Sequence, residues 1–247
     1  MSNIKRKKII ILVISVILAV LLIIGGIAIY ASDYYRADAK AIRTFAEKYG
    51  VERNEIDGGL TFGDIDSEIG FIFYPGGKVE YTSYEPLMTV LASKGVFCVL
   101  LEMPLNLAVL DMNAADGICE KYTGVERWYI GGHSLGGAMA ASYVSSHTSD
   151  FDGLVLLGAY STADFSESEL DVLCLHGSED GVMDREKHDE YISNLPTNAI
   201  ESEINGGCHA YFGAYGAQDG DGQPTISLED QITATANEIF QLILRGE

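Results

Sequence analysis

The sequence predicts an α/β fold in which a mostly parallel central sheet is covered by helices on both faces. Apolar runs of strand length recur along the chain, and segments with the apolar period of a helix lie between them. Strands that are apolar throughout are typical of a sheet buried on both faces, because a solvated face would alternate polar and apolar residues. About 215 residues follow the first thirty, which is the size of one domain of this kind.

The first thirty residues differ from the rest of the chain. A basic N-terminus, residues 1–8, precedes an uncharged apolar run over residues 9–30. A helix of about 20 apolar residues crosses a bilayer, whereas the apolar part of a cleavable signal has about 7–15 residues. We therefore expect a transmembrane anchor, with removal of a signal after Ala31 as the alternative. Because basic residues favour the cytoplasmic side, residues 1–8 are expected in the cytoplasm and the main domain outside the cell membrane.

The elements after the anchor are expected in the following order. Residues 31–50 form a juxtamembrane helix or linker, and residues 51–247 form the main domain, which begins with an edge hairpin over residues 51–62. Further strands are expected over residues 69–74, 96–101, 128–130, 154–157, 172–175 and 199–204. Helices are expected over residues 84–93, 113–122, 138–146, 186–195 and 228–245, and Ser227 with Asp230 forms a capping box before the last.

Charge and cysteine content exclude some functions. The chain after residue 30 has a net charge of −24, because four of the 16 basic residues and none of the 36 acidic ones precede it. Such a charge disfavours nucleic acid as a partner and promotes solubility.

The four cysteines form no C-x-x-C pair, so neither a zinc site nor thioredoxin-like chemistry is predicted; they are Cys98, Cys119, Cys174 and Cys208. Cys98 and Cys174 lie in apolar strands and are expected in the core; an external compartment permits a disulfide, but the spacing identifies none.

The segment from residue 127 to residue 141 predicts a nucleophile. A short apolar strand leads into Gly132-His133-Ser134-Leu135-Gly136, and a helix-forming segment follows. The G-x-S-x-G motif requires this context, because its glycines let strand and helix approach each other around a strained turn. Ser134 is therefore the predicted nucleophile, and the backbone N–H of Leu135, at the helix start, is a predicted oxyanion donor. The alternative is an ordinary glycine-rich loop.

A serine hydroxyl becomes a useful nucleophile when a base removes its proton. On such a sheet the acid and then the base should follow the serine in the chain, in loops at the carboxyl ends of later strands. His209 follows the strand at residues 199–204 and is the predicted base. The other histidines fit less well: His147 and His188 are expected to be solvated on or beside helices, His133 lies inside the motif, and His176 precedes the acid.

The acid and the second oxyanion donor are each predicted with an alternative. Asp180 is the predicted acid because the glycine after it suits a tight turn that presents the carboxylate; Glu179 is the reserve, and Asp184 is a further candidate. The second oxyanion donor is predicted at Gly77, with Lys78 next, in the turn after the strand at residues 69–74. A backbone N–H can approach a tetrahedral intermediate only where side chains are absent, although this turn could also simply end a strand.

Five segments add a resemblance to a known family. They are YPGGKV at 74–79, MPLNLA at 103–108, GGHSLGGA at 131–138, GSEDG at 177–181 and GGCHAYFG at 206–213. With these segments the chain from about Ile69 onward resembles the α/β-hydrolase superfamily, in detail the small hydrolases related to dienelactone hydrolase. The resemblance implies an α/β-hydrolase fold, the triad roles for Ser134, Asp180 and His209, and the oxyanion roles for Gly77 and Leu135. Cys208 departs from the family pattern, in which asparagine is expected, and this puts the local hydrogen bonding in doubt.

Together these features predict a membrane-anchored serine hydrolase of carboxylesterase type that forms an acyl-enzyme and needs no metal or organic cofactor. Residues 158–171 alone separate two strands where many hydrolases of this fold insert a lid, so a minimal lid and an open site for small or exposed acyl esters are expected. The expected partners are a small-molecule or envelope acyl ester and the membrane, not nucleic acid. The alternatives are an acyltransferase with the same triad, a peptidase, and a binding module on an inactive hydrolase fold.

Overall fold

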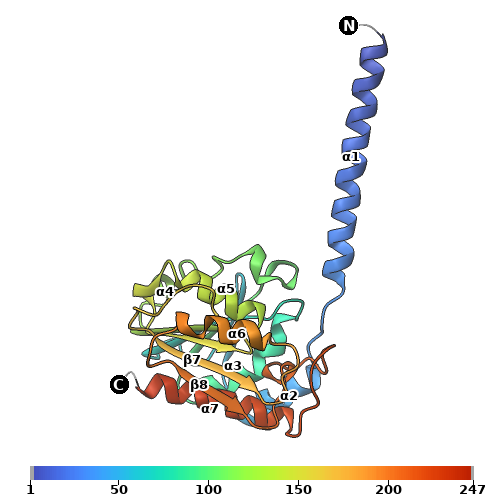
Figure 1. The fold of residues 1–247 in the computed structure, drawn as a ribbon. Coiled ribbons are helices and arrows are strands. Elements are labelled where there is room, and N and C mark those ends of the chain that lie inside the picture. Colours follow the sequence, from blue (N-terminus) through green and yellow to red (C-terminus); the bar gives the residue numbers. More distant parts are fainter. Residues whose placement is uncertain (1–2, 246–247) are drawn as a thin grey trace. The chain divides into compact units, whose positions relative to one another are not determined.

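The computed structural model describes residues 3–245 of the chain (Figure 1). Contacts divide the chain into two units, the first ending at Tyr34 and the second beginning at Tyr35. The first unit is helix α1, Asn3–Ser32. Within the described residues, its segment Lys7–Tyr30 is the one helix long and apolar enough to cross a membrane, a property that an N-terminal signal sequence shares. Part of the expected basic N-terminus, residues 1–2, lies outside the described residues.

The second unit is built on an eight-stranded sheet with the order β1-β2-β4-β3-β5-β6-β7-β8. Strands β1 and β2 form an antiparallel hairpin that pairs antiparallel with β4, and all other neighbours are parallel. The strands are β1 Arg53–Ile56, β2 Gly59–Phe62, β3 Ile69–Tyr74, β4 Phe97–Leu101, β5 Arg127–His133, β6 Gly153–Leu157, β7 Asp171–Gly177 and β8 Ile200–Ile204. The predicted α/β fold with an edge hairpin is therefore confirmed.

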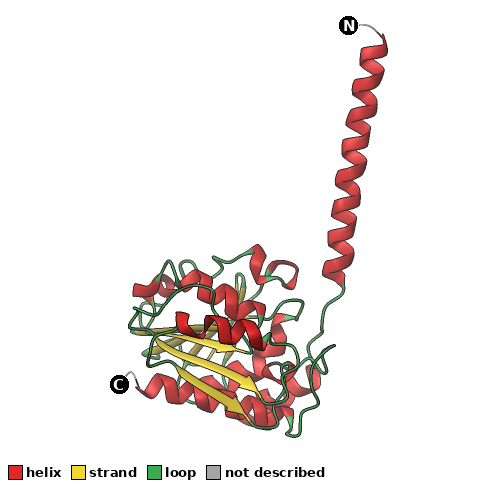
Figure 2. Cartoon of the chain, viewed as in Figure 1, coloured by secondary structure: helices red, strands yellow, loops and turns green. Residues whose placement is uncertain are grey.

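Helices cover both faces of this sheet (Figures 1 and 2). Helices α2 (Ala39–Tyr49), α3 (Glu85–Ala92) and α7 (Leu228–Arg245) pack on one face, and α4 (Ile118–Lys121), α5 (Leu135–Val144) and α6 (Arg185–Tyr191) pack on the other. Short 3₁₀ helices occupy connections: η1 Tyr81–Tyr84, η2 Pro104–Asn106, η3 Ala108–Leu110, η4 Thr148–Asp150, η5 Ile192–Asn194 and η6 Ala210–Phe212.

The apolar strands divide their side chains between two cores. In β3, Phe71 and Phe73 belong to the core under α3 and α7, whereas Ile72 and Tyr74 belong to the core under α5. Successive residues of a strand point to opposite faces, so a strand buried on both sides is apolar throughout. All four are fully buried. The two cores hold the strand ends in fixed positions, and the loops at those ends carry the candidate site.

Two local expectations were wrong. Of the helix expected over residues 113–122, only the four-residue helix α4 forms, because Gly117 takes a left-handed backbone conformation (φ 74°) and the residues before it form turns. His188 was expected to be solvated, but it is buried with 4% of its surface exposed, because its ring packs against the ring of His176 in β7, with the centroids 6.0 Å apart.

The second unit also begins earlier than the expected boundary at residue 51. Helix α2 starts where the Asp38 side chain accepts hydrogen bonds from the Lys40 and Ala41 amides, and it ends at Gly50, which is left-handed at φ 61°. Its Phe45 is buried in the core together with residues of α3 and α7. Helix α2, which was expected as a juxtamembrane helix or linker, is therefore packed into the second unit.

Residues 35–38, which we call the strap, are fastened to two loops of the second unit. The Tyr35 N–H donates to the Lys78 carbonyl at 2.8 Å, and the Glu80 N–H donates back to the Tyr35 carbonyl at 2.9 Å. The Asp38 N–H donates to the Ala214 carbonyl at 2.8 Å. The strap therefore joins the loop after β3 to the loop after β8.

Candidate active site

Ser134 occupies a strained turn between β5 and α5. Its backbone lies at φ 52° and ψ −122°, a region that costs a residue with a side chain roughly 1–3 kcal/mol. The turn fits because its neighbours have no side chains: a Cβ at Gly136 would overlap the carbonyl oxygens of Tyr74 and Pro75, and one at Gly132 would lie 2.5 Å from the carbonyl carbon of Gly136. The packing of β3 against this turn thus stabilises the strained conformation of Ser134.

The predicted acid and base form a buried pair. His209 Nδ1 lies 2.8 Å from Asp180 Oδ2, and both side chains are almost completely inaccessible to solvent. The other carboxylate oxygen accepts hydrogen bonds from the Val182 and Met183 amides at 2.9 and 2.8 Å. Burial raises the pKa of Asp180, but the hydrogen bond and the charge of His209 and the two amides together outweigh burial and lower it. Asp180 is therefore a carboxylate, which accepts the Nδ1 proton and leaves Nε2 as the acceptor.

The alternative acids lie elsewhere. Glu179 is exposed and accepts a hydrogen bond from the hydroxyl of Ser178. Asp184 is exposed and caps α6 by accepting a hydrogen bond from the Lys187 amide at 3.0 Å. Of the three acids considered from the sequence, Asp180 is the one in contact with His209.

Ser134 and His209 are close neighbours in the fold without a direct hydrogen bond. The Nε2 atom of His209 is buried and has no hydrogen-bond partner among the described residues. The Ser134 amide donates to the Leu157 carbonyl at 2.9 Å, and the next residue, Gly158, lies against the acid–base pair. In enzymes without substrate, catalytic hydrogen bonds are often long or absent and form in the substrate complex. The carboxyl ends of β5, β7 and β8 thus bring the three predicted residues to one edge of the sheet.

Gly158 is a site residue that the sequence reasoning missed. A Cβ at this position would lie 2.8 Å from His209 Nδ1 and 3.1 Å from Asp180 Oδ2, and the backbone is left-handed at φ 52°. A side chain here would therefore collide with the acid–base pair and strain the backbone. The available signal was a glycine directly after the apolar strand at residues 154–157.

The turn after β3 presents its amides beside Ser134. A Cβ at Gly77 would lie 2.9 Å from Leu135 Cδ2, so this turn touches the start of α5. The Gly76 amide donates to Tyr84 Oη at 3.0 Å, and the Lys78 amide donates to the Asn106 carbonyl at 2.7 Å. The Gly77 amide has no acceptor among the residues that the structure describes. Since the first amides of a helix lack intrahelical acceptors, the Leu135 amide at the start of α5 is similarly available.

The loop that carries His209 is held by polar contacts. The Asp221 carboxylate accepts hydrogen bonds from the His209 and Ala210 amides at 3.1 and 2.8 Å. The Gln231 side chain of α7 accepts from the Cys208 amide at 2.9 Å and donates to the Cys208 carbonyl at 2.7 Å. These contacts satisfy the backbone at Cys208, where the sequence departs from the expected pattern. All four cysteines are free thiols.

His133 and Tyr84 were also not predicted as site residues. The His133 ring is buried, and its centroid lies 4.3 Å from that of His209. Tyr84 Oη lies 2.8 Å from His133 Nδ1. The signal for His133 was its place inside the G-x-S-x-G motif, but nothing in the sequence indicates that Tyr84 reaches it.

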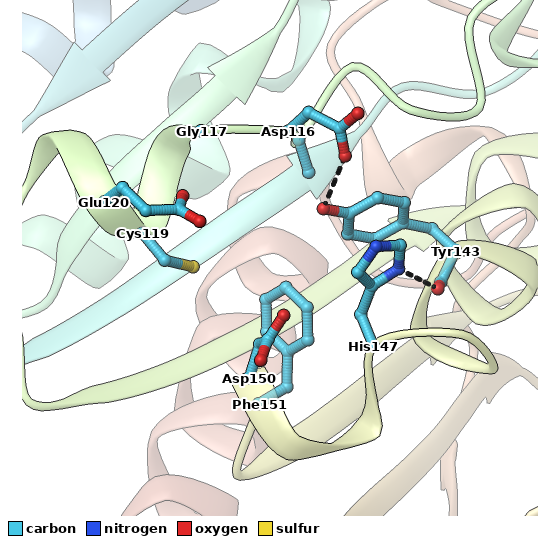
Figure 3. A pocket seen from close by; sticks show the side chains of 9 residues that line it. Asp116, Gly117, Cys119, Glu120, Tyr143, His147, Asp150 and Phe151 are labelled. Atoms are coloured by element: carbon cyan, nitrogen blue, oxygen red, sulfur yellow. Dashed lines mark hydrogen bonds between the residues drawn. The ribbon is translucent and has the colours of Figure 1, made fainter.

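Two hollows lie on either side of α5. One, of about 430 Å³, lies beside Ser134 and is lined by Leu135, Ala138, Met139, Ser142, Gly158, Ala159, Tyr160, Thr162, Val182, Met183 and Asp184. The other, of about 490 Å³, contains none of the predicted site residues. Figure 3 shows this second hollow, in which the Tyr143 hydroxyl donates to the Asp116 carboxylate and the His147 ring donates to the Tyr143 carbonyl. Within the described part of the chain, no cluster of three or more metal-ligating side chains occurs.

The fold and the site together define a class of protein. A mostly parallel sheet with a strained serine turn after a central strand, and with an acid and a histidine after later strands, is the arrangement of α/β hydrolases. The profile of the alpha/beta hydrolase family matches residues 70–233. The chain belongs to this family.

Two solved structures share the fold. Dienelactone hydrolase from Anabaena variabilis aligns with a TM-score of 0.58 at 13% identity, covering 79% of this chain and 98% of its own. A predicted CIB-like hydrolase from Thermoplasma acidophilum aligns with a TM-score of 0.52 at 15% identity, covering 76% of this chain and 96% of its own. A search of curated proteins returned no match. The resemblance inferred from the sequence is therefore confirmed for the superfamily, and at these identities the likeness establishes the fold alone.

Proposed function

We propose that this chain is a membrane-anchored serine hydrolase of carboxylesterase type. Ser134 is the nucleophile, His209 the general base and Asp180 the acid that orients the base. The observation that carries the proposal is the buried 2.8 Å contact between His209 Nδ1 and Asp180 Oδ2 at the edge of the sheet where Ser134 takes its strained conformation.

The chemistry follows from this arrangement. Ser134 Oγ attacks the ester carbonyl carbon while its proton passes to His209 Nε2, which is the acceptor because Nδ1 donates to Asp180. The Gly77 and Leu135 amides stabilise the oxyanion. The C–O bond then breaks, the leaving alcohol takes the proton from His209, and an acyl-enzyme remains. A water molecule attacks this ester with His209 again as base, and the carboxylic acid is released. Asp180 stays ionised throughout.

Fluorophosphonate labelling tests the proposal directly. An activated serine reacts with this probe to form a stable covalent adduct, which mass spectrometry locates in a peptide. We expect the full-length protein in detergent to carry the adduct on Ser134. A folded protein that does not react would refute the proposal and favour a binding module on an inactive fold.

The hollow beside Ser134 indicates small acyl groups. Its volume is about 430 Å³, and residues 158–171, where a lid would be inserted, form no helix. Thr162 and Asp184 of its lining are exposed, so we expect acyl chains that outgrow the hollow to meet polar groups and solvent and to gain no further apolar burial.

On p-nitrophenyl esters we therefore expect kcat/KM to stay within about tenfold for short acyl chains and to fall steeply beyond about eight carbons. The measurement is a steady-state series from acetate to palmitate, with detergent held constant. A kcat/KM that rises toward long chains would contradict the open-site interpretation and favour a lipase.

The N-terminal helix supports a membrane location with the catalytic unit outside the cell. Its segment Lys7–Tyr30 is apolar, and cations precede it. We expect the full chain to remain in the membrane after alkaline carbonate extraction, and protease added to intact cells to digest the catalytic unit. Replacing residues 9–30 with a known cleavable signal gives the matched soluble control. Recovery of the native chain as a soluble protein that begins near Ser32 would show that the helix is a signal sequence.

A further inference from the structure

A buried chain of hydrogen bonds connects the turn after β3 to His133. The Gly76 amide donates to Tyr84 Oη at 3.0 Å, and Tyr84 Oη lies 2.8 Å from His133 Nδ1. Tyr84 and His133 are fully buried. Among the described residues, His133 Nδ1 is the one acceptor within reach of the Tyr84 hydroxyl proton, so we assign this proton to the hydrogen bond with Nδ1. With this assignment the neutral His133 ring carries its own proton on Nε2.

His133 in turn forms one wall around His209. The two ring centroids are 4.3 Å apart with an interplanar angle of 47°, and the centroid of the Phe212 ring lies 5.5 Å from that of His133. No hydrogen-bond partner for His133 Nε2 exists among the described residues. The ring therefore contacts His209 by packing.

His133 stays neutral when His209 is protonated. Burial and the positive charge of His209 hold the pKa of His133 well below its usual value, and the opposing effects of the Asp180 carboxylate and of the His209 backbone are smaller. Tyr84, which faces His133 from η1, donates a hydrogen bond that requires an unprotonated Nδ1. A proton taken from Ser134 therefore stays on the ring that contacts Asp180, which is His209.

The close packing of Gly76, Tyr84 and His133 leaves little freedom at either end of this chain of hydrogen bonds. A Cβ at Gly76 would lie 2.7 Å from Tyr84 Oη and 2.8 Å from His133 Nδ1, so the backbone, the hydroxyl and the ring are in mutual contact. Gly76 directly precedes Gly77, and His133 directly precedes Ser134. One tyrosine hydroxyl therefore links the residue before the oxyanion donor, the residue before the nucleophile and the ring that supports the base.

We propose that Tyr84 and His133 are positioning residues, which fix the Gly77 amide and the His209 ring relative to each other for the reaction. This inference rests on the proposed hydrolase function. Both residues are buried, so in this proposal they act through the groups that they hold in place. A displacement of about 1 Å in such groups can slow a reaction by about 10²-fold.

Substitution of Tyr84 removes one hydroxyl and tests the proposal in the full-length enzyme. We expect Tyr84→Phe to lower kcat about 10- to 100-fold with KM changed by less than about threefold, and to slow fluorophosphonate labelling of Ser134 in parallel. Tyr74→Phe is the matched control, because Tyr74 is equally buried and its hydroxyl also accepts from one amide, at Ala115, and donates to one carbonyl, at Met112. A comparable loss of kcat in both variants would show a purely structural role and overturn the proposal.

Substitution of His133 provides a second test if Tyr84→Phe does not fold. His133→Asn keeps an acceptor for the Tyr84 hydroxyl close to the position of Nδ1, whereas His133→Leu does not. We expect His133→Leu to lower kcat as much as Tyr84→Phe does, and the kcat of His133→Asn to be about tenfold higher than that of His133→Leu. The double variant Tyr84→Phe/His133→Leu should be no slower than the slower single variant. Equal rates for the two His133 variants, or additive losses in the pair, would overturn the proposal.

The outcomes also separate this inference from the proposed function. If wild-type protein reacts with fluorophosphonate at Ser134 and Tyr84→Phe reacts at the same rate, the function stands and the positioning role fails. If folded wild-type protein does not react at all, the function itself fails.

Discussion

Replacement of Ser134 by alanine is expected to lower kcat at least about 10⁴-fold on every ester that the wild-type protein hydrolyses. The substitution removes the oxygen that forms the acyl-enzyme, and the hydrogen bonds of the turn are made by backbone atoms, such as the Ser134 amide with the Leu157 carbonyl. Alanine takes the same strained backbone as serine, so the free energy of unfolding should change by less than about 1 kcal/mol. Steady-state kinetics and urea unfolding measure the two effects.

Ser142 offers the matched control for this experiment. It lines the same hollow as Ser134 but lies on α5, away from the turn. Ser142→Ala should retain kcat within about threefold of wild type, since a residue that does not react contributes only local contacts. Turnover by Ser134→Ala within tenfold of wild type would remove the nucleophile from the proposal.

Replacement of Asp180 by asparagine is expected to lower kcat about 10³- to 10⁴-fold with little change in KM. The carboxylate accepts the Nδ1 proton of His209 and stabilises the imidazolium, whereas an amide can present its NH₂ group and favour the wrong tautomer. Its other oxygen would still accept from the Val182 and Met183 amides. Glu179→Gln is the control, because it removes an exposed neighbouring charge and should leave kcat near wild type.

The same carboxylate makes stability depend on pH. Its folded-state pKa is lowered, so ionised Asp180 stabilises the folded protein above its unfolded-state pKa, which is about 4. This stabilisation is lost as the pH falls through the lower, folded-state pKa. The difference in unfolding free energy between wild type and Asp180→Asn should therefore be largest at neutral pH and shrink in acid. A difference independent of pH down to pH 3 would contradict the assignment of the charged pair.

The fold and the contact between the predicted acid and base could be predicted from patterns in the sequence. Uninterrupted apolar runs such as residues 69–74 identify strands buried on both faces, and the order serine, acid, histidine along the chain led to the contact between Asp180 and His209. The apolar runs are local features, and the order of the three residues follows a rule of topology. Both can therefore be recognised without knowledge of the packing.

What the sequence did not reveal depends on packing between distant segments. Tyr84 reaches His133 because its ring packs against Phe73 of β3 and its hydroxyl lies beside His133 of β5, and this contact leaves no trace in the spacing of the two residues. The burial of His188 likewise depends on how far α6 is rotated, which a short helix with a mostly charged sequence does not indicate. The hydrogen bond between the Lys78 amide and the Asn106 carbonyl likewise joins two loops and is not indicated by the spacing of these residues.

The strap has a consequence for proteolysis near the start of the second unit. A cut between Ser32 and Tyr35 leaves every strap contact in place, so the remaining fragment keeps the backbone contacts between the strap and both loops. A cut after Asp38 instead removes the hydrogen bonds that the strap makes with the Lys78 and Ala214 carbonyls and with the Glu80 amide, so the loops after β3 and β8 lose these contacts. Two cuts four to six residues apart would thus leave the candidate site with loops that are held to different degrees.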